Sequence, residues 1–381
     1  MDITKFGSKK NGEIIRITGS LGLDYAFIPN PLPPKWNWPV SLWQLLLDAR
    51  TALACLDGVG RYLPNPELLL SPLRNQEAIR SSSLEGTYAT PEQLILFQID
   101  PDQKQPTAEK INTFREVDNY AKAIRYYFQG ESKLPVSLRL IRDLHRILLS
   151  NVRGEDKLPG EFRRTQNQIG RPARYVPPSP DRLLGCLDNL EKYMYEESSY
   201  DPLVKAFIIH YQFEAIHPFL DGNGRVGRLL LAILIKEWCN LQNQWLYMSA
   251  YFDSYMDQYI DNLFAVSTDS NWYAWIEFCL KGVIQQASDT QLRCDQLIAL
   301  SNTFKERLGS VKVSGRLFTI AENLFITPYI QIPYIAKKFE VEYQTAETDI
   351  EKLIKVGILK KLENSKTKTY YSPEILNIAY I

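Results

Sequence analysis

The segment HPFLDGNGRVGR, from His217 to Arg228, constrains the fold most strongly because it joins two apolar runs with helical spacing, LVKAFIIHYQFEAI and LLLAILIKEWC. Pro218 ends the first helix and places His217 at its exit, where the side chain can face a cleft. The second helix is expected to begin within the glycine-rich stretch. A helix start attracts anions and disfavours cations, so Arg225 and Arg228 at this start indicate a bound phosphate.

The turn between these helices has the composition of an anion site. Gly222, Asn223 and Gly224 accept left-handed backbone conformations that direct N–H groups toward one point. Asp221, a hard acid beside phosphates, suits Mg²⁺, which takes one or two carboxylates together with substrate oxygens. Any one of these residues alone is more often an ordinary cap, turn or core residue. Their occurrence together in a fixed order favours a phosphate site.

Composition argues against several other classes of protein. Lys plus Arg equals Asp plus Glu at 44 each, so no overall field draws the chain toward nucleic acid or an anionic membrane. The scattered cysteines lack C-x-x-C spacing, which argues against a disulfide framework or a structural zinc site. His210 and His217 are too far apart on a helix to share one metal, which argues against a zinc hydrolase. No run reaches the ~18 apolar residues of a membrane span. We therefore expect a soluble cytoplasmic protein without a membrane partner.

The periodicity of apolar residues predicts a mainly α-helical protein of three domains. Residues 1–105 contain an extended proline-rich arm, PNPLPPKWNWP, and helices up to about Ile95. Residues 106–305 are helical except between Arg153 and Asp181, where Gly, Pro and β-forming residues predict a β-hairpin. Residues 306–381 contain three short helices and then two strands around a basic turn, GILKKLENSKTKTYYS, which is typical of a winged helix.

The segment from His217 to Arg228 resembles the signature of the Fic family, H-x-F-x-[DE]-G-N-G-R-x-x-R, and agrees with it at every specified position. The resemblance implies a Fic-type helical bundle with a β-hairpin flap, an N-terminal helical segment and a C-terminal winged-helix domain. It also implies an enzyme that transfers AMP from Mg-ATP to Tyr, Thr or Ser hydroxyls of proteins, itself included. The residues agree with this chemistry, because a near-neutral imidazole activates a hydroxyl and arginines stabilise charge during phosphoryl transfer.

The resemblance also implies individual roles within the motif. His217 is the general base and Asp221 holds Mg²⁺. The ATP-binding residues that it implies are Gly222, Asn223, Gly224, Arg225, Gly227 and Arg228. The glycine turn cradles the phosphates and the two arginines hold the β and γ phosphates.

A second segment, PGEFRRTQNQIGRPARYVPPSP at residues 159–180, looks like the flap that holds the target protein in this family. A target docked near residues 167–176 would add to the flap as a strand, held by backbone hydrogen bonds. An ordinary surface hairpin is the alternative.

A third segment, SSSLEG from Ser81 to Gly86, matches the inhibitory signature [ST]-x-x-x-E-[GN] of members regulated from their N-terminal side. Gly86 predicts the end of a helix, which puts Glu85 at a helix C-terminus, where an acid is disfavoured. Pairing Glu85 with Arg228 would relieve both unfavourable placements and would withhold the arginine from ATP. The alternative is a capping box formed by Ser82 and Glu85.

One position departs from the family pattern. Members often carry an Asn that contacts adenine after the motif helix, whereas the stretch MSAYFDSYMDQYIDNL places Tyr255 there. Tyr255 could stack on the base as part of the ATP site. The alternative is a stripe of Tyr251, Tyr255 and Tyr259 that serves only helix packing.

Two rival functions remain open. The chain could be a DNA-binding regulator with a ligand-sensing Fic core, because its C-terminal part resembles a helix-turn-helix. The expected recognition helix, Gln344 to Lys355, carries the acids Glu347, Asp349 and Glu351, which phosphates repel. Only the wing is basic, through Lys360, Lys361, Lys366 and Lys368. DNA binding is therefore disfavoured against structural docking or a homodimer. In the other rival function, Glu85 orients a water molecule that removes AMP from a modified protein.

Overall fold

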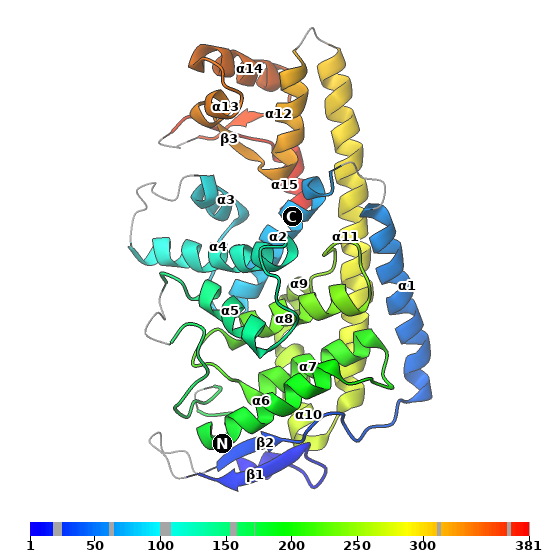
Figure 1. The fold of residues 1–381 in the computed structure, drawn as a ribbon. Helices are drawn as coiled ribbons and strands as arrows, with labels where there is room; N and C mark the ends of the chain where they lie inside the picture. Colours follow the sequence, from blue (N-terminus) through cyan, green and yellow to red (C-terminus); the bar gives the residue numbers. More distant parts are fainter. Residues whose placement is uncertain are drawn as a thin grey trace.

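The structure, a computed structural model, describes residues 1–17, 25–60, 65–99, 108–152, 158–170, 172–310, 314–363 and 367–380. These residues form a mainly helical molecule with two small antiparallel sheets at opposite ends (Figure 1). The mainly α-helical class expected from the sequence is therefore correct. Among the described residues, no helix combines the length and the apolar character needed to cross a bilayer.

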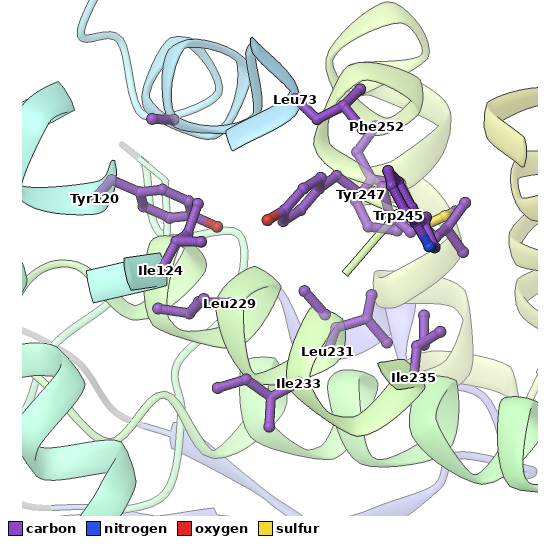
Figure 2. Packing of buried hydrophobic residues seen from close by; sticks show 14 of the residues in the cluster. Leu73, Tyr120, Ile124, Leu229, Leu231, Ile233, Ile235, Trp245, Tyr247 and Phe252 are labelled. Carbon is purple, nitrogen blue, oxygen red and sulfur yellow. The ribbon is translucent and has the colours of Figure 1, made fainter. Parts of the chain in front are cut away.

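The centre of the molecule is the antiparallel pair α7 (Pro202–Ile216) and α8 (Asn223–Trp238), which flank the glycine-rich turn. Both helices are buried over most of their surface, since their sequences are apolar on nearly every face. The helices around them are α4 (Ala108–Phe128), α5 (Leu138–Leu148), α6 (Pro180–Tyr195), α10 (Met256–Asp269) and α11 (Trp272–Gly309). Figure 2 shows Leu229, Leu231, Ile233 and Ile235 of α8 within this core.

The long helix α11 connects the two ends of the molecule. At 1.5 Å per residue it spans about 57 Å, and α1 (Trp43–Gly60) packs along it (Figure 1). A short 3₁₀ turn, η2 (Val40–Leu42), leads into α1, and another, η1 (Ile3–Lys5), lies at the N-terminus. The helix α2 (Glu67–Ser83) packs against α4, α8 and α9 (Ser249–Ser254), and α3 (Pro91–Ile99) follows it. Leu73 of α2 and Phe252 of α9 belong to the shared core.

The N-terminal segment contains a hairpin that sequence reasoning missed. Strands β1 (Gly12–Arg16) and β2 (Tyr25–Pro29) pair antiparallel, with Ile14 opposite Phe27. The strands GEIIR and YAFIP are rich in apolar and β-forming residues, but no strand is expected from the sequence before the proline-rich arm. The backbone N–H of Phe27 donates to the carbonyl of Val176 at 2.9 Å, which ties this hairpin to the end of the flap segment.

The C-terminal segment contains α12 (Gly315–Ile326), α13 (Ile332–Lys338) and α14 (Tyr343–Lys355), followed by the hairpin β4 (Lys360–Lys361) and β5 (Thr369–Tyr371). A short strand β3 (Tyr329–Gln331) completes a sheet of order β3-β5-β4, and α15 (Pro373–Tyr380) follows. These last two elements were not expected. Lys366 of the expected wing lies outside the described residues, and the winged-helix classification stays a prediction.

The division into three domains also stays a prediction. The boundary expected at 105/106 lies outside the described residues. The boundary expected at 305/306 falls inside α11, which continues to Gly309. The expected hairpin between Arg153 and Asp181 consists, in its described part, of one antiparallel bridge between Ile169 and Tyr175.

Candidate active site

The turn between α7 and α8 is fixed by its own backbone and by one side chain. His217 caps α7 in a left-handed conformation, with φ of 50° and ψ of 63°, and its N–H donates to the carbonyl of Phe213. Gly222, with φ of 74°, is the N-cap of α8. The amide of Asn223 accepts from the N–H of Phe219 and donates to its carbonyl, both at 2.8 Å. The Asn223 side chain therefore braces the turn, and its backbone N–H is one of the unpaired donors at the start of α8.

The imidazole of His217 is set up as a neutral base. Its Nδ1 lies 3.3 Å from the carbonyl oxygen of Glu214. Because a carbonyl only accepts, the proton belongs on Nδ1 and the lone pair on Nε2. Burial, aided by the charge of Arg163 and opposed by that of Glu85, lowers the pKa of His217 to about 4. At neutral pH the ring is therefore unprotonated and able to accept a proton.

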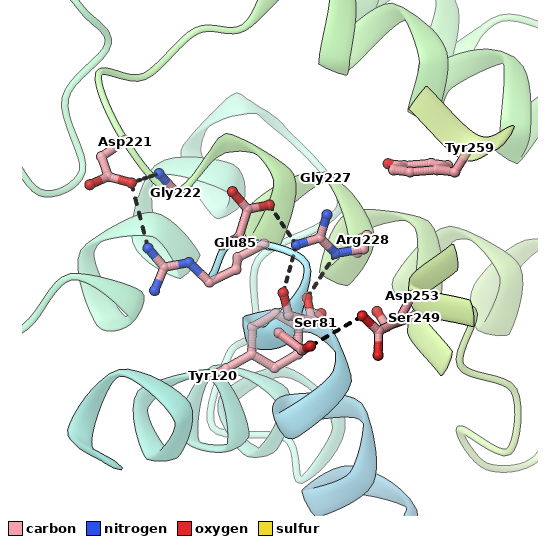
Figure 3. Close-up of polar contacts among 12 residues, drawn as sticks. Ser81, Glu85, Tyr120, Asp221, Gly222, Gly227, Arg228, Ser249, Asp253 and Tyr259 are labelled. Atoms are coloured by element: carbon pink, nitrogen blue, oxygen red, sulfur yellow. Dashed lines mark hydrogen bonds and ion pairs between the residues drawn. The ribbon is translucent and has the colours of Figure 1, made fainter. Parts of the chain in front are cut away.

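Arg228 is buried and bound to the segment from Ser81 to Gly86. Its Nε donates to Oγ of Ser81 at 2.9 Å, and its Nη2 donates to the Ser81 carbonyl and to Oε1 of Glu85, each at 2.8 Å (Figure 3). Burial opposes ionisation of Glu85, but the charge and hydrogen bond of Arg228 outweigh it, so the pKa of Glu85 lies below its ordinary value. The expected pairing of Glu85 with Arg228 is present in the structure.

Glu85 lies at a helix end as expected, but Arg228 does not lie at a helix start. Leu84 caps α2, Glu85 follows it, and Gly86 turns the chain with φ of 80°, as expected for a helix end. Arg228, however, lies in the second turn of α8, because the helix begins at Asn223. The expectation that Arg228 belongs to the helix start was therefore wrong, and the residue of the first turn is Arg225.

The carboxylate of Glu85 lies directly over the start of α8. A Cβ placed on Gly224 would be 2.1 Å from Oε1 of Glu85 and 2.8 Å from Nη1 of Arg228. Glycine at 224 is thus required for this close approach, and the carboxylate stands where the helix start would hold an anion. Gly227 permits a second close approach, since a Cβ there would be 2.1 Å from Oε1 of Glu214.

Arg225 and Asp221 lie on the other side of the turn. A guanidinium nitrogen of Arg225 is 3.6 Å from the Asp221 carboxylate, and another is 3.6 Å from that of Glu116. Asp221 also accepts from the N–H of Gly222 at 2.6 Å. Arg225 is buried, and its Nε and Nη1 have no hydrogen-bond partner within the described part of the chain. No group of three or more metal-binding side chains gathers among the described residues.

A cavity of about 230 Å³ adjoins the turn. Its polar side is formed by His217, Arg228 and Glu85, and the α10 side is largely apolar. The residues of the α10 side are Met256, Tyr259, Ile260, Leu263 and Phe264. One end of the cavity therefore suits phosphates and the other suits a flat apolar group such as a base.

Tyr255 is not among the residues that line this cavity. It separates α9 from α10, is 42% exposed, and its ring packs on Tyr251 at 4.8 Å between centroids. Tyr251 and Tyr259 are both buried, but the break at Tyr255 means that the three do not form one continuous helical stripe. Tyr259 is the tyrosine that reaches the cavity.

Two comparisons by sequence identify the family. Residues 135–235 match the model of the Fic/DOC family, and residues 43–129 match that of the Fic/DOC family N-terminal region. The chain is a Fic-domain protein. The protein adenylyltransferases Fic of Drosophila grimshawi and Drosophila virilis are each 41% identical over 106 residues. That segment is 27% of this chain and 21% of each relative, so the chain matches about a fifth of the relatives' length.

Solved structures share the Fic fold over a larger part of the chain. A Fic family protein from Desulfovibrio desulfuricans aligns with a TM-score of 0.56 at 17% identity, over 90% of this chain and 98% of that one. Fic-1 (residues 134–508) from C. elegans aligns with a TM-score of 0.52 at 18% identity, over 69% of this chain and 74% of that one. At these identities the likeness concerns the fold alone.

Sequence reasoning missed several residues that shape this Fic site. His145 of α5 stacks on Phe219, and its Nε2 lies 3.0 Å from the carbonyl of Asp221. Glu214 lines the cavity, and burial raises its pKa to about 8. The spacing of Glu214 three residues before His217 could have suggested its position, but no local signal connects His145, which is distant in the chain, with Asp221.

Proposed function

We propose that this chain transfers AMP from Mg-ATP to Tyr, Thr or Ser hydroxyls of proteins, itself included. The observation that carries the proposal is one cavity lined by the neutral base His217, the start of α8 at Gly224 and the guanidinium of Arg228. The names of the Drosophila relatives, protein adenylyltransferases, agree with it.

In the proposed reaction, Nε2 of His217 takes the proton of the attacking hydroxyl. The hydroxyl oxygen bonds to the α-phosphorus of ATP, the bond from that phosphorus to the β-phosphate bridging oxygen breaks, and pyrophosphate leaves. The N–H groups at Gly222, Asn223 and Gly224 and the arginines 225 and 228 stabilise the negative charge on the phosphates.

Asp221 is the residue proposed to hold Mg²⁺, which would neutralise phosphate charge when bound. A single carboxylate at the turn fits a metal held mostly by substrate oxygens, and its contacts with Arg225 and Gly222 would have to yield. Asp221→Ala should abolish labelling and the response to added Mg²⁺. A variant that labels equally with and without the metal, and as fast as the wild type, would remove Asp221 from this role.

Glu85 is proposed to keep the enzyme inactive at rest. Its carboxylate binds Arg228 and stands over Gly224, so it competes with the γ-phosphate for both. The flap at residues 167–176 is proposed to hold the target chain, although Arg171 lies outside the described residues. Proline in place of Ile169, which donates its N–H to Tyr175, should weaken labelling of a protein target without weakening ATP binding.

Incubation with ATP labelled on the α or on the γ phosphate tests the proposed function. Transfer of AMP predicts that only the α label becomes bound to protein, alone and in lysate, and that mass spectrometry finds one AMP per modified hydroxyl. Attachment of the γ label to protein would show phosphate transfer instead. If the Glu85→Gly variant attaches neither label to protein, the proposal is contradicted.

The removal of AMP is a second candidate, favoured by one observation. Glu85 and His217 line the same cavity, so the carboxylate could orient a water molecule toward a bound phosphodiester. AMP removal is supported if the wild type releases AMP from a pre-modified target and the Glu85→Gly variant does not. If the wild type releases no AMP, this second candidate function is excluded.

A further inference from the structure

Arg163, at the base of the flap, is bound to the catalytic turn on three successive residues. Its backbone N–H donates to the carbonyl of Pro218 at 2.9 Å, and its Nε donates to that of His217 at 2.9 Å. Its Nη2 donates to the carbonyl of Ile216 at 3.4 Å. One residue therefore satisfies the carbonyls before, at and after His217.

These three contacts explain how His217 keeps its backbone conformation. A left-handed φ is unfavourable for a residue with a side chain and persists where the surroundings over-determine it. Without Arg163, the carbonyls at the C-terminal end of α7 would need water molecules as hydrogen-bond donors. By binding the carbonyls of residues 216, 217 and 218, Arg163 fixes the direction in which the imidazole leaves the chain.

The same guanidinium holds both ends of the flap. Its Nη1 donates to the carbonyl of Thr165 at 3.4 Å, and Nη2 donates to the carbonyl of Pro178. The segment between Thr165 and Pro178 includes residues 167–176, where the target is proposed to dock. The guanidinium therefore joins both ends of this segment to the turn that carries His217.

Arg163 is also a buried charge without an acidic partner. It is 3% exposed, and within the described part of the chain no carboxylate forms an ion pair with it. Burial lowers the pKa of Arg163 to about 10, so the group stays charged at neutral pH. Carbonyl dipoles take the place of a counter-ion.

The charged and titratable groups that face His217 come from five parts of the chain: the flap segment, the residue after α2, α7, α8 and α10. Arg163 and Arg174 belong to the flap segment, Glu85 follows α2, Glu214 belongs to α7 and Arg228 to α8; Tyr175, Tyr211 and Tyr259 complete the cavity. Arg163 disfavours the protonated imidazole, and Glu85 favours it. Arg163 thus acts on both the direction and the protonation of the base.

We propose that Arg163 is the positioning residue of the base: it joins the turn at residues 216–218 to both ends of the flap segment and fixes the direction in which the His217 imidazole leaves the chain. This inference rests on the proposed function for its kinetic consequence. Its structural consequence, the protonation behaviour of His217, can be measured without any activity.

The experiment compares Arg163→Gln, Arg163→Lys and the matched control Arg164→Gln in the full chain. Arg164 is the neighbouring flap arginine, 79% exposed and paired with Glu161, so its removal should change nothing. The chain has only three histidines, so carbon-13 labelling of histidine gives one resolvable NMR signal for each. Self-labelling at saturating ATP and ATP affinity are measured on the same variants in a Glu85→Gly background.

In the wild type, the His217 signal should stay constant between about pH 8 and 5, because the ring remains neutral. In the Arg163→Gln variant the pKa of His217 should be higher than in the wild type. This variant should also label roughly a hundredfold more slowly, since a small misplacement of the base costs about that much. Arg163→Lys keeps the charge but cannot bind all the carbonyls, so it should label slowly without the upward shift in pKa. ATP affinity should be unchanged throughout.

Three results would overturn the inference. The first is a wild-type His217 that titrates at its ordinary pKa, which needs no variant. The second is an Arg163→Gln protein with unchanged His217 titration, and the third is a folded Arg163→Lys protein that labels as fast as the Arg164→Gln control. If no variant transfers AMP, the proposed function fails, and the NMR titration still decides the inference about Arg163.

Discussion

At the scale of single residues, the turn fixes both the backbone and the tautomer of His217. Its left-handed backbone costs about 1 kcal/mol relative to ordinary helix, and the hydrogen bond from Nδ1 to the Glu214 carbonyl fixes the tautomer. Nε2 is the remaining basic atom. The imidazole can therefore accept a proton at Nε2, which is the role proposed for it.

His217→Ala should lower AMP transfer by about a hundredfold to ten-thousandfold, the range for loss of a general base. Folding and ATP affinity should stay close to the wild type, because the ring makes one hydrogen bond and does not grip the nucleotide. Single-turnover labelling and calorimetric titration with ATP check the two halves. Equal labelling by the variant would remove His217 from the proposed mechanism.

At the scale of elements, α2 is held to the core along its length on the side that carries Ser81. Glu77 accepts from the hydroxyl of Tyr120 on α4 at 2.9 Å and from the hydroxyl and N–H of Ser249 on α9. Further along, Ser83 donates to Asp253 of α9 at 3.1 Å. These bonds fix α2 so that Glu85 meets Arg228 at the end of the helix.

Glu77 should make this attachment dependent on pH. Burial raises the pKa of Glu77 from 4.5 to about 7. Between pH 4.5 and about pH 7, the folded protein therefore keeps a proton on Glu77 that the unfolded chain has released. The resulting stabilisation is full below about pH 4.5 and is lost as pH rises to about 7, amounting to about 3 kcal/mol at most.

Glu77→Gln should remove this dependence, so the wild type should lose stability relative to the variant on going from about pH 5 to about pH 8. Urea unfolding at the two pH values measures the difference. Glu214, whose pKa is also raised, is present in both proteins, so its contribution to the pH dependence cancels in the comparison. A difference between the proteins that is the same at both pH values would contradict the assignment.

The sequence predicted the elements whose signals are local and missed those that depend on distant contacts. The helices α7 and α8, the turn between them and the helix end at Gly86 follow from periodicity, Pro and Gly. The pairing of Glu85 with Arg228 was anticipated because a motif suggested it. His145, Glu77 and Arg163 could not be found in this way, since their partners lie far along the chain and their own neighbours carry no signal of them.

At the scale of the whole molecule, the C-terminal elements pack on the helix that precedes Glu85. Oγ of Ser71 on α2 donates to the carbonyl of Ile326 at the end of α12, at 3.0 Å. The amide of Asn75 donates to the hydroxyl of Tyr380 on α15 at 3.4 Å. The C-terminal segment therefore contacts α2 directly, as structural docking requires, and its binding to DNA stays a separate question that the next experiment tests.

The charges of that segment predict no appreciable affinity for DNA. On α14, Glu347 pairs with Lys368 at 3.0 Å and Asp349 pairs with Arg316 at 2.6 Å. Two of the nearby cations are therefore already paired with acids of the expected recognition helix. Fluorescence anisotropy with a labelled duplex of arbitrary sequence should show no binding at micromolar protein, even at low salt. A complex that dissociates as salt is added would favour the regulatory alternative.

The proposed restraint of the whole enzyme by Glu85 is tested most directly by the intact mass of the protein after incubation with Mg-ATP. The wild type, Glu85→Gly, Arg228→Ala and Glu85→Gly with His217→Ala are compared over time. Removing Glu85 frees Arg228 for the γ-phosphate. A charge-assisted bond contributes about 1.5 to 3 kcal/mol, and because the Glu85 side chain is 35% exposed, the gain should lie near the lower end, about tenfold.

Glu85→Gly should therefore gain the mass of AMP about ten times faster than the wild type, and the double variant should gain none. Arg228→Ala should not gain mass faster than the wild type, because it frees the inhibitory segment but also removes the donor that ATP needs. The proposed restraint by Glu85 is contradicted if Glu85→Gly binds nucleotide as well as the wild type but labels no faster at saturating Mg-ATP.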